Sequence, residues 1–417
     1  MGMEPESSTT TLHRFSQLTT IALVLLGLFL PLSETGKQCA IILIIIASSV
    51  CLVKQYRAVK FDIVDWSLLI FLLSSLLSVF FAKDFYESVG AQYDIDREVH
   101  ALYSFVRVVL VFYAVRYVDV SGSAIEIFLF VVVASCMLAI GYGEFRVLSG
   151  MKKFLELKGV GHVNHSSIYS AMVCLISLNL SLYYGKKIIL YPIAFVVSFC
   201  TVLQSGSRAS FLAVLVGIVG HFLRDRKDSR KIFFVLLAVA GATAVVVYFN
   251  ELTWVQMKKG FYSPGRIFIW KVTLSEWLKH NIFFGIGPNN SYYVNPVSYA
   301  KSLRNGWTHL GHSHNTFLTI LLENGLVGLI SYCVFVISIF LKLFFCKIGK
   351  CASFLMIGID ISIVNFINSF ANTTFSSSSN EILMVVIWAI SLRCMDGAVS
   401  RQKINLLPVL VKRQCMV

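Results

Sequence analysis

Residues 21–32 read IALVLLGLFLPL, and residues 40–53 read AIILIIIASSVCLV. With its flanking residues, each run is long enough to cross the roughly 30 Å hydrocarbon layer of a bilayer as a helix. The first run is followed by Ser33-Glu34-Thr35-Gly36-Lys37 instead of a small-residue cleavage site, and the second run begins at once. We therefore interpret the first run as an uncleaved span and not as a signal peptide.

Similar runs recur along the chain and predict an all-α, polytopic transmembrane helical protein with about 12 spans. We expect residues 1–417 to form a single integral membrane domain, with a large loop at residues 250–315 that contains amphipathic helices. The expected spans lie near residues 20–32, 38–53, 64–82, 101–118, 123–142, 167–184, 187–204, 209–223, 231–249, 326–345, 353–370 and 381–393.

The composition excludes a soluble globular protein. Hydrophobic residues make up 57% of the chain and charged residues only 14%, far from the balance of a soluble domain. The net charge of +14 would suggest nucleic acid as a partner of a soluble protein, but cytoplasmic loops of membrane proteins collect Lys and Arg. We expect no nucleic-acid partner. The ten cysteines are scattered, without a CxxC pair, and indicate neither a disulfide framework nor a metal site.

The positive clusters between the predicted spans fall on one side if both termini are cytoplasmic, as the positive-inside bias requires. These inner clusters contain Lys54, Arg57, Lys60, Lys186, Lys187, Arg224, Lys231, Lys342, Lys347, Lys350, Arg401, Lys403, Lys412 and Arg413. On the outer side, residues 83–100 are acidic, but residues 143–166 and 250–315 carry more basic than acidic residues. Either an anionic substrate on that face or contact with lipid phosphates would explain the two basic outer loops.

Arg208 lies between two apolar runs at their predicted outer end. A guanidinium is always charged and its planar fork matches phosphate oxygens. The alternative is an interfacial anchor that extends to the lipid headgroups.

Arg266 follows Ser263-Pro264-Gly265, which predicts a helix with Ser at the N-cap and Pro at its first position. The helix N-terminus and Arg266 would together form an anion site. Downstream apolar residues recur at helical spacing and predict an amphipathic helix on the membrane surface, so an ordinary interfacial helix is the alternative. These apolar residues are Ile267, Trp270, Leu274, Trp277 and Leu278.

His314 and Asn315 precede Gly325 and Gly328 in the pattern HNx9GxxG. If the stretch is helical, eleven residues at about 100° each bring Gly325 to the face of His314, three turns along. Glycines on that face would let another helix or a lipid tail approach closely. A histidine at the outer mouth of a span can take a proton from a hydroxyl near neutral pH.

Other candidate sites are weaker. Asp94-Ile95-Asp96 resembles the DxD of nucleotide-sugar glycosyltransferases, but the chain has no nucleotide-binding α/β domain, so we interpret it as a solvated acidic loop. His309, His312 and His314 lie close together without a nearby carboxylate or cysteine, and we predict no metal site. Glu323 would fall on the opposite side of the helix from His314.

Together these motifs resemble the O-antigen ligase family of Gram-negative bacteria, which belongs with the O-antigen polymerases in one superfamily of multi-span glycosyltransferases. The pattern from His314 to Gly328 is similar to the ligases' signature HNx9GxxG. The motifs that carry the resemblance are Ser207-Arg208-Ala209, Gly265-Arg266, Phe284-Gly285-Ile286-Gly287-Pro288-Asn289 and His314-Asn315 with Gly325 and Gly328.

The resemblance implies a metal-independent, inverting membrane glycosyltransferase without a cofactor. It would transfer O-antigen polysaccharide from undecaprenyl diphosphate to an outer-core sugar of lipid A-core, at the periplasmic face of the bacterial inner membrane. Arg208 and Arg266 would bind the diphosphate, and His314 would hydrogen-bond the acceptor hydroxyl or remove its proton. The membrane helices would hold the lipid carrier in register, and membrane lipids would be further partners. The resemblance also implies supporting roles for Asn315, Gly325, Gly328 and His312.

Two other functions stay open at this point. An O-antigen polymerase would use the same donor with a second carrier-linked glycan as acceptor. A flippase or transporter for the lipid-linked glycan predicts ionisable residues at mid-membrane depth, for which Arg107 and Asp360 are candidates.

Overall fold

The structure is a computed structural model that describes residues 6–55, 59–90, 93, 95–184, 188–224, 241, 264–294, 313–346, 352–372, 374 and 377–414. Within these residues it is entirely helical and contains no strand, which confirms the predicted all-α class. The helices are α1 (Glu6–Phe29), α2 (Glu34–Gln55), α3 (Ile63–Ser88), α4 (Ile95–Tyr117), α5 (Gly122–Leu148), α6 (Val163–Tyr184), α7 (Leu190–Gln204), α8 (Arg208–Arg224), α11 (Pro264–Lys279), the short 3-10 helix η4 (Asn290–Tyr293), α12 (Thr316–Phe345), α13 (Ala352–Ser369) and α14 (Ser378–Gln414).

Among these described helices, seven are long and apolar enough to cross a membrane, and four shorter segments are also apolar. The eleven expected spans other than 231–249 all coincide with helices, while 231–249 lies outside the described residues. The number of crossings therefore stays a prediction. The seven long segments are Glu34–Val53, Ile63–Ser88, Ile95–Tyr117, Gly122–Leu148, Val163–Tyr184, Thr316–Phe345 and Ser378–Asp396.

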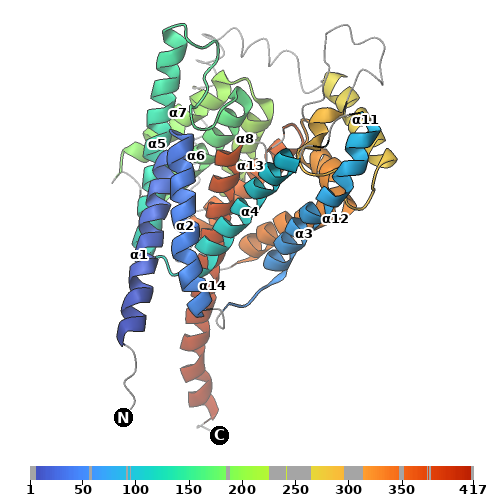
Figure 1. Ribbon diagram of the computed structural model, residues 1–417. Helices are drawn as coiled ribbons and strands as arrows, with labels where there is room; N and C mark the ends of the chain where they lie inside the picture. Colours follow the sequence, from blue (N-terminus) through green and yellow to red (C-terminus); the bar gives the residue numbers. More distant parts are fainter. Residues whose placement is uncertain are drawn as a thin grey trace.

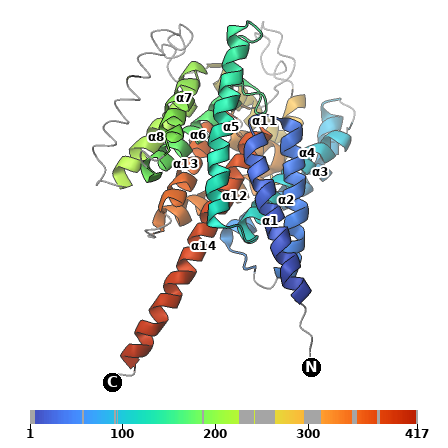
Figure 2. The same ribbon diagram turned by 90° about the vertical axis from the view of Figure 1, so that its left-hand side faces the viewer.

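The helices form an upright group and an oblique group. Figures 1 and 2 show α1, α2 and α5 running side by side along the long axis, with α3 and α12 packed together at a steep angle to them. α6 lies at the centre, where it packs against α7, α8 and α13. The interior face of α6 is rich in serine, including Ser166, Ser167 and Ser170, and such small side chains let helices approach closely.

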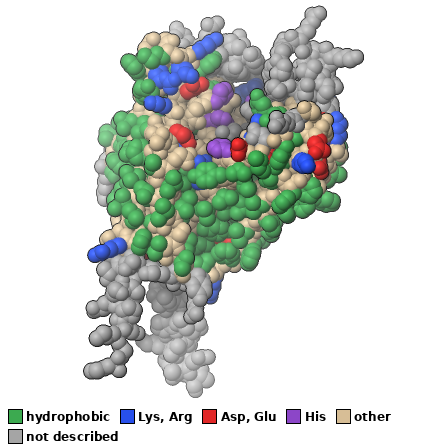
Figure 3. All heavy atoms as spheres, in the orientation of Figure 1, with side chains coloured by type: hydrophobic (Ala, Val, Ile, Leu, Met, Phe, Trp, Pro, Cys, Tyr) green, Lys and Arg blue, Asp and Glu red, His purple; other side chains and the backbone are tan. Residues whose placement is uncertain are grey.

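Both described ends of the chain lie at the same end of the molecule, since α1 begins and α14 ends at the lower edge of Figures 1 and 2. Figure 3 shows a broad hydrophobic belt across one face, with most of the charged and histidine side chains gathered above it. The turn between α7 and α8, α11 and the start of α12 lie at this upper end. The arrangement is what one expects of helices surrounded by lipid.

An ion network ties α3, α4 and α12 together at the lower end. Asp62 caps α3 and pairs with Arg116 of α4 at 2.6 Å and with Lys342 of α12. Arg116 also lies 3.4 Å from Asp65. Because these charges are partnered within the fold, the network fixes the oblique group of helices at the end opposite α11.

Part of the predicted 250–315 loop is described, and it is ordered against the helices. α11 begins at Pro264, as the Ser-Pro signal predicts. It buries Ile269 and Val272, whereas Ile267, Leu274 and Leu278 stay exposed. Three residues of the predicted stripe therefore face outward, whereas its two tryptophans, Trp270 and Trp277, pack against the buried face. The buried face joins a small apolar cluster with the end of α3 and the middle of α12, made of Ala82, Phe85, Tyr86, Ile269, Val272, Ile286, Val294 and Leu322.

Candidate functional site

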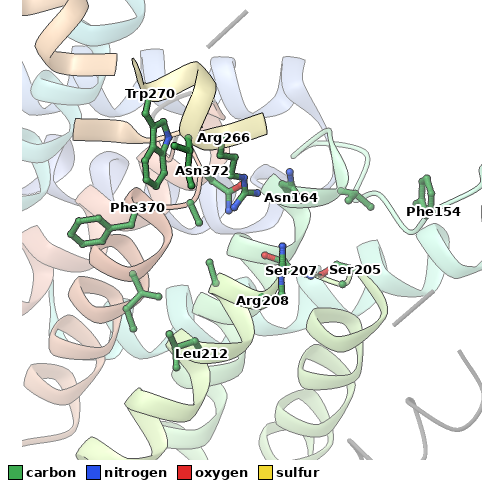
Figure 4. Close-up of a pocket in the computed structure, with 16 residues that line it drawn as sticks. Phe154, Asn164, Ser205, Ser207, Arg208, Leu212, Arg266, Trp270, Phe370 and Asn372 are labelled. Atoms are coloured by element: carbon green, nitrogen blue, oxygen red, sulfur yellow. Dashed lines mark hydrogen bonds between the residues drawn. The ribbon is translucent and has the colours of Figure 1, made fainter. Parts of the chain in front are cut away.

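A cavity of about 630 Å³ lies at the upper end of the molecule, between α8, α11 and the end of α13. Arg208 and Arg266 both line it, although they are far apart in the sequence. Figure 4 shows Arg266 entering the cavity from α11 and Arg208 from the start of α8. Asn164 and Asn372 lie beside Arg266 in the same view. The complete lining is Phe154, Val163, Asn164, Ser205, Gly206, Ser207, Arg208, Ala209, Leu212, Arg266, Ile267, Trp270, Ile367, Phe370, Ala371 and Asn372.

The turn between α7 and α8 positions Arg208. Gly206 has a φ of +66°, which only glycine adopts at little cost, and this reverses the chain directly before α8. Ser207 donates to Ser210, which in turn donates to Asn368 of α13 at 3.0 Å. The Nη1 atom of Arg208 is buried and has no hydrogen-bond partner among the described residues. A buried guanidinium nitrogen normally has an acceptor, which a water molecule or a ligand would supply here.

Arg266 sits in the first turn of α11 and faces a second positive charge. Burial and the neighbouring Arg208 guanidinium both lower the pKa of Arg266 below its usual value. An arginine nevertheless keeps its charge near neutral pH. No acidic side chain is among the described residues that line this cavity. Two facing guanidiniums without a carboxylate form an anion site, and their forked donors suit phosphate oxygens.

His314 lies directly before α12 and not inside it. Asn315 is the N-cap, since its side chain accepts from the Leu318 amide at 3.1 Å. His314 has a φ of +52°, a left-handed conformation that costs energy for a residue other than glycine. The prediction that His314 and Gly325 share one helical face is therefore wrong, because the helix starts after His314.

The turn that holds His314 is tied to the arginine cavity from two sides. Trp270 of α11 lines the cavity and donates from Nε1 to the Ser313 carbonyl at 3.1 Å. Thr316, two residues after His314, donates to the carbonyl of Asn372, which also lines the cavity. These contacts place the His314 turn at the edge of the anion site.

Gly325 interrupts α12, with a φ of +65° and a ψ of −165°. In a continuous helix the amides of Leu326 and Val327 would bond the carbonyls of Leu322 and Glu323. Here those amides donate to the carbonyls of Ile282 and Phe283, at 2.9 and 3.1 Å.

The two carbonyls that the break leaves open are also taken by the inserted segment. The Leu322 carbonyl accepts from the Ile286 amide, and the Glu323 carbonyl accepts from the Gly287 amide, each at 3.0 Å. A Cβ on Gly325 would lie 2.2 Å from the backbone of Phe283. The two glycine motifs noted in the sequence, 284–289 and 325–328, are thus the two halves of one backbone clasp.

Gly328 allows close packing on the other side of α12. A Cβ built there would lie 3.1 Å from Ser74 Oγ of α3 and 2.4 Å from Asn324 Cβ. The predicted close approach of another helix is therefore seen at Gly328, while at Gly325 the neighbour is the inserted segment. His312, also predicted to support the site, lies outside the described residues, as do His309 and Asp94.

Sequence reasoning missed three features of the site. Trp270 was placed on a membrane-facing stripe, but its indole links α11 to Ser313. Asn372 carried no local signal. Glu323, expected to have no role at His314, accepts from the Ser291 hydroxyl at 2.7 Å and so holds η4 against α12. In the described part of the chain, no three His, Cys, Asp or Glu side chains are grouped as metal ligands would be.

Comparison with known families bears on the same segment. Residues 193–333 match the family model described as O-antigen ligase. The resemblance to the O-antigen ligase family is thereby confirmed. The match spans about a third of the chain, from within α7 to the middle of α12, and includes Arg208, Arg266 and His314. No curated protein matches the chain.

The segment that resembles O-antigen ligases supplies most of what surrounds the cavity. It contains the α7–α8 turn, α11 and both halves of the backbone clasp. Asn164 and Asn372, which line the cavity beside Arg266, come from outside it. The apolar helices and the matched segment together resemble those of a membrane glycosyltransferase-like enzyme of the ligase and polymerase superfamily.

Proposed function

We propose that this protein is an O-antigen ligase that transfers O-antigen polysaccharide from undecaprenyl diphosphate to lipid A-core. The reaction takes place at the periplasmic face of the bacterial inner membrane, with both termini in the cytoplasm. One observation carries the proposal. Two guanidiniums that lie far apart in the sequence line one cavity without a carboxylate, next to the turn that holds His314.

In this proposal Arg208 and Arg266 bind the diphosphate of the donor. The bond between the anomeric carbon and the diphosphate oxygen breaks, and the electron pair leaves with the diphosphate, whose charge rises. Two fixed guanidiniums stabilise that developing charge more than they stabilise the bound donor, which lowers the barrier. The apolar residues at the edge of the cavity, such as Leu212 and Phe370, lie where the lipid part of the carrier would run.

His314 acts on the acceptor in the same step. The acceptor hydroxyl attacks the anomeric carbon from the face opposite the leaving diphosphate, so the configuration inverts. Its proton passes to a ring nitrogen of His314, which works as a general base near neutral pH. The left-handed backbone of His314 supports this role, because strained residues cluster at functional sites.

A transfer assay with the full-length protein in proteoliposomes tests the proposal. With undecaprenyl diphosphate-linked O-antigen and lipid A-core, wild-type protein should form the ligated product, and Arg266→Ala should lose it almost completely. Lys279→Ala is a matched control, since Lys279 lies at the other end of α11 and pairs with Glu276. Equal activity of Arg266→Ala and wild type would contradict the proposal.

The polymerase alternative uses the same anion site and differs in the acceptor. A deletion strain separates the two functions. Loss of all O-antigen from lipid A-core, with accumulation of the carrier-linked polymer, supports a ligase. A lipopolysaccharide profile that stops after one repeat unit would instead identify a polymerase.

A further inference from the structure

A second cavity, of about 830 Å³, opens on the other side of the first turns of α12. Thr316, Thr319 and Glu323 of α12 line it, together with residues from α2, α3, α4, η4 and the start of α14. Thr316 also donates to the carbonyl of Asn372 in the wall of the arginine cavity, at 3.1 Å. The start of α12, just after His314, therefore separates two cavities.

The lining of the second cavity differs in chemistry from that of the first. Its carboxyl groups come from Glu34, Glu323 and Glu381, against one guanidinium, that of Arg107. Amides, hydroxyls and an imidazole complete the polar lining, from Gln38, Ser75, His100, Tyr103, Ser104, Asn289, Ser291, Thr316, Thr319, Asn324 and Ser378. Acidic and histidine side chains also gather above the hydrophobic belt in Figure 3, on the face that carries α3, α4 and α12. Lys37 pairs with Glu34, so this lining offers mainly hydrogen-bonding groups and not the two facing guanidiniums of the first cavity.

Two buried polar atoms of residues in this wall have no hydrogen-bond partner among the described residues. Asn324 is 6% exposed, and its Oδ1 atom has no hydrogen-bond partner among the described residues. Arg107 is 5% exposed and donates from Nη1 to Gln38 at 2.7 Å, but its Nε has no partner there. Burying such groups unpaired is costly. The two residues that carry this unpartnered acceptor and donor both line the second cavity, which suits a ligand that offers both kinds of group.

The wall around these groups is fixed before any ligand binds. The buried Lys37 ammonium holds Glu34 at 2.6 Å and Ser379 at 2.9 Å, which joins α2 to the start of α14. On the opposite side, the Ser291 hydroxyl donates to Glu323 at 2.7 Å. A preformed polar wall loses little freedom on binding, so its hydrogen bonds contribute to affinity.

We propose that the second cavity binds the uncharged, hydroxyl-rich end of the acceptor glycan. This inference rests on the proposed function and adds to it the place at which the acceptor binds. Sugar hydroxyls donate to carboxylates and to Asn324 Oδ1 while accepting from Arg107, whereas a lipid tail could do neither. Donor and acceptor then reach the His314 turn from opposite sides of α12.

The matched variants Asn324→Ala and Asn372→Ala test this placement, since each removes one amide from one cavity. In the proteoliposome assay, Asn324→Ala should raise the KM for lipid A-core about fivefold to tenfold, the loss of one hydrogen bond, and leave the KM for the donor within about twofold. Asn372→Ala should raise the donor KM instead. Glu381→Gln serves as a second variant with unchanged shape, and thermal unfolding in detergent checks that each variant folds.

Equilibrium binding separates this inference from the proposed function. The probe is the core oligosaccharide released from lipid A-core and freed of phosphate, with purified full-length protein. Weaker binding by Asn324→Ala and Glu381→Gln than by wild type and Asn372→Ala supports the cavity, even if wild type transfers nothing and the proposed function fails. An unchanged Kd in both variants, or a rise only in the donor KM, overturns the inference.

Discussion

Basic side chains lie near both ends of α12, but only at one end are they paired with carboxylates. At the Lys342 end, Arg116 and Lys342 pair with Asp62, and Arg116 also lies beside Asp65. At the Asn315 end, Arg208 and Arg266 share a cavity whose described lining contains no acid. The first arrangement neutralises charge inside the fold, and the second leaves charge for a ligand. Arginine in a membrane protein is therefore interpreted better from its neighbours than from its depth.

The largest expected effect comes from a substitution that changes only the Asn315 end of α12. His314→Ala should lower kcat by about 10²- to 10⁴-fold, because a positioned general base contributes on that scale. Product formation in proteoliposomes measures it. His280→Ala is the control, since His280 lies beside Glu276 and Phe85 at the end of α11 and should retain activity. Normal transfer by His314→Ala would show that His314 is not the general base.

Replacing one arginine at each end should give opposite kinds of defect. Arg266→Ala should lower kcat/KM about 100-fold or more, as loss of transition-state charge stabilisation does, with the unfolding temperature little changed. Arg116→Ala should destabilise the fold by about 3–5 kcal/mol, because it leaves the buried Asp65 without its positive partner. Thermal unfolding and donor KM, measured on both variants, distinguish the two. A changed donor KM in an Arg116→Ala protein that still folds would contradict the difference drawn between the two ends of α12.

Gly325→Ala should destabilise the protein by about 2–3 kcal/mol. Its φ is in the left-handed region, and its Cβ would overlap the Phe283 backbone. The unfolding temperature in detergent reports the loss. Gly141→Ala in α5 meets nothing within 4 Å of the new Cβ and should be neutral or slightly stabilising. Equal unfolding temperatures for the two variants would mean that the clasp contributes no stability.

Inorganic diphosphate should inhibit transfer in competition with the donor, because it presents the group that the two arginines bind. Inhibition should weaken as salt rises, since free phosphates are screened, and should be several-fold weaker in Arg208→Lys, which keeps the charge but loses the planar fork. The inhibition constant at two ionic strengths is the measurement. If diphosphate instead competes with lipid A-core, the arginine cavity would bind the acceptor and the second cavity the donor.

The smallest effect concerns pH at the end of α11. Burial alone would raise the pKa of Glu276, but hydrogen bonds from His280 and Lys279 outweigh it and hold the pKa below its ordinary 4.5. A lowered pKa stabilises the fold above pH 4.5, and this stability is lost as pH falls through the folded value. Glu276→Gln should cost about 1 kcal/mol or less at pH 7 and nothing at low pH, as thermal unfolding would show. A constant difference across pH would contradict this.

The sequence predicted the parts of the site that depend on local patterns. Apolar runs predicted the helices, and Ser263-Pro264 predicted the start of α11. The family resemblance paired Arg208 with Arg266, and both line one cavity, while their binding of a diphosphate stays a prediction. The helical relation between His314 and Gly325 failed because it assumed an unbroken helix. Gly325 is non-helical because residues 282–287 form hydrogen bonds with the backbone on both sides of it. Segments that pair across some forty residues cannot be recognised from the local spacing of apolar residues.

The clasp at Gly325 also determines which substitutions the site tolerates. Its four hydrogen bonds run between backbone groups, so they make no demand on the side chains of Ile282, Phe283 or Leu326. Together with the hydrogen bond from the Trp270 indole to the Ser313 carbonyl, they couple α11 and the segment after it to α12 and the turn before it. The spacing between Arg266 and the proposed base thus depends on main-chain hydrogen bonds and on one indole. Substitutions of the three side chains named above should therefore leave that spacing unchanged.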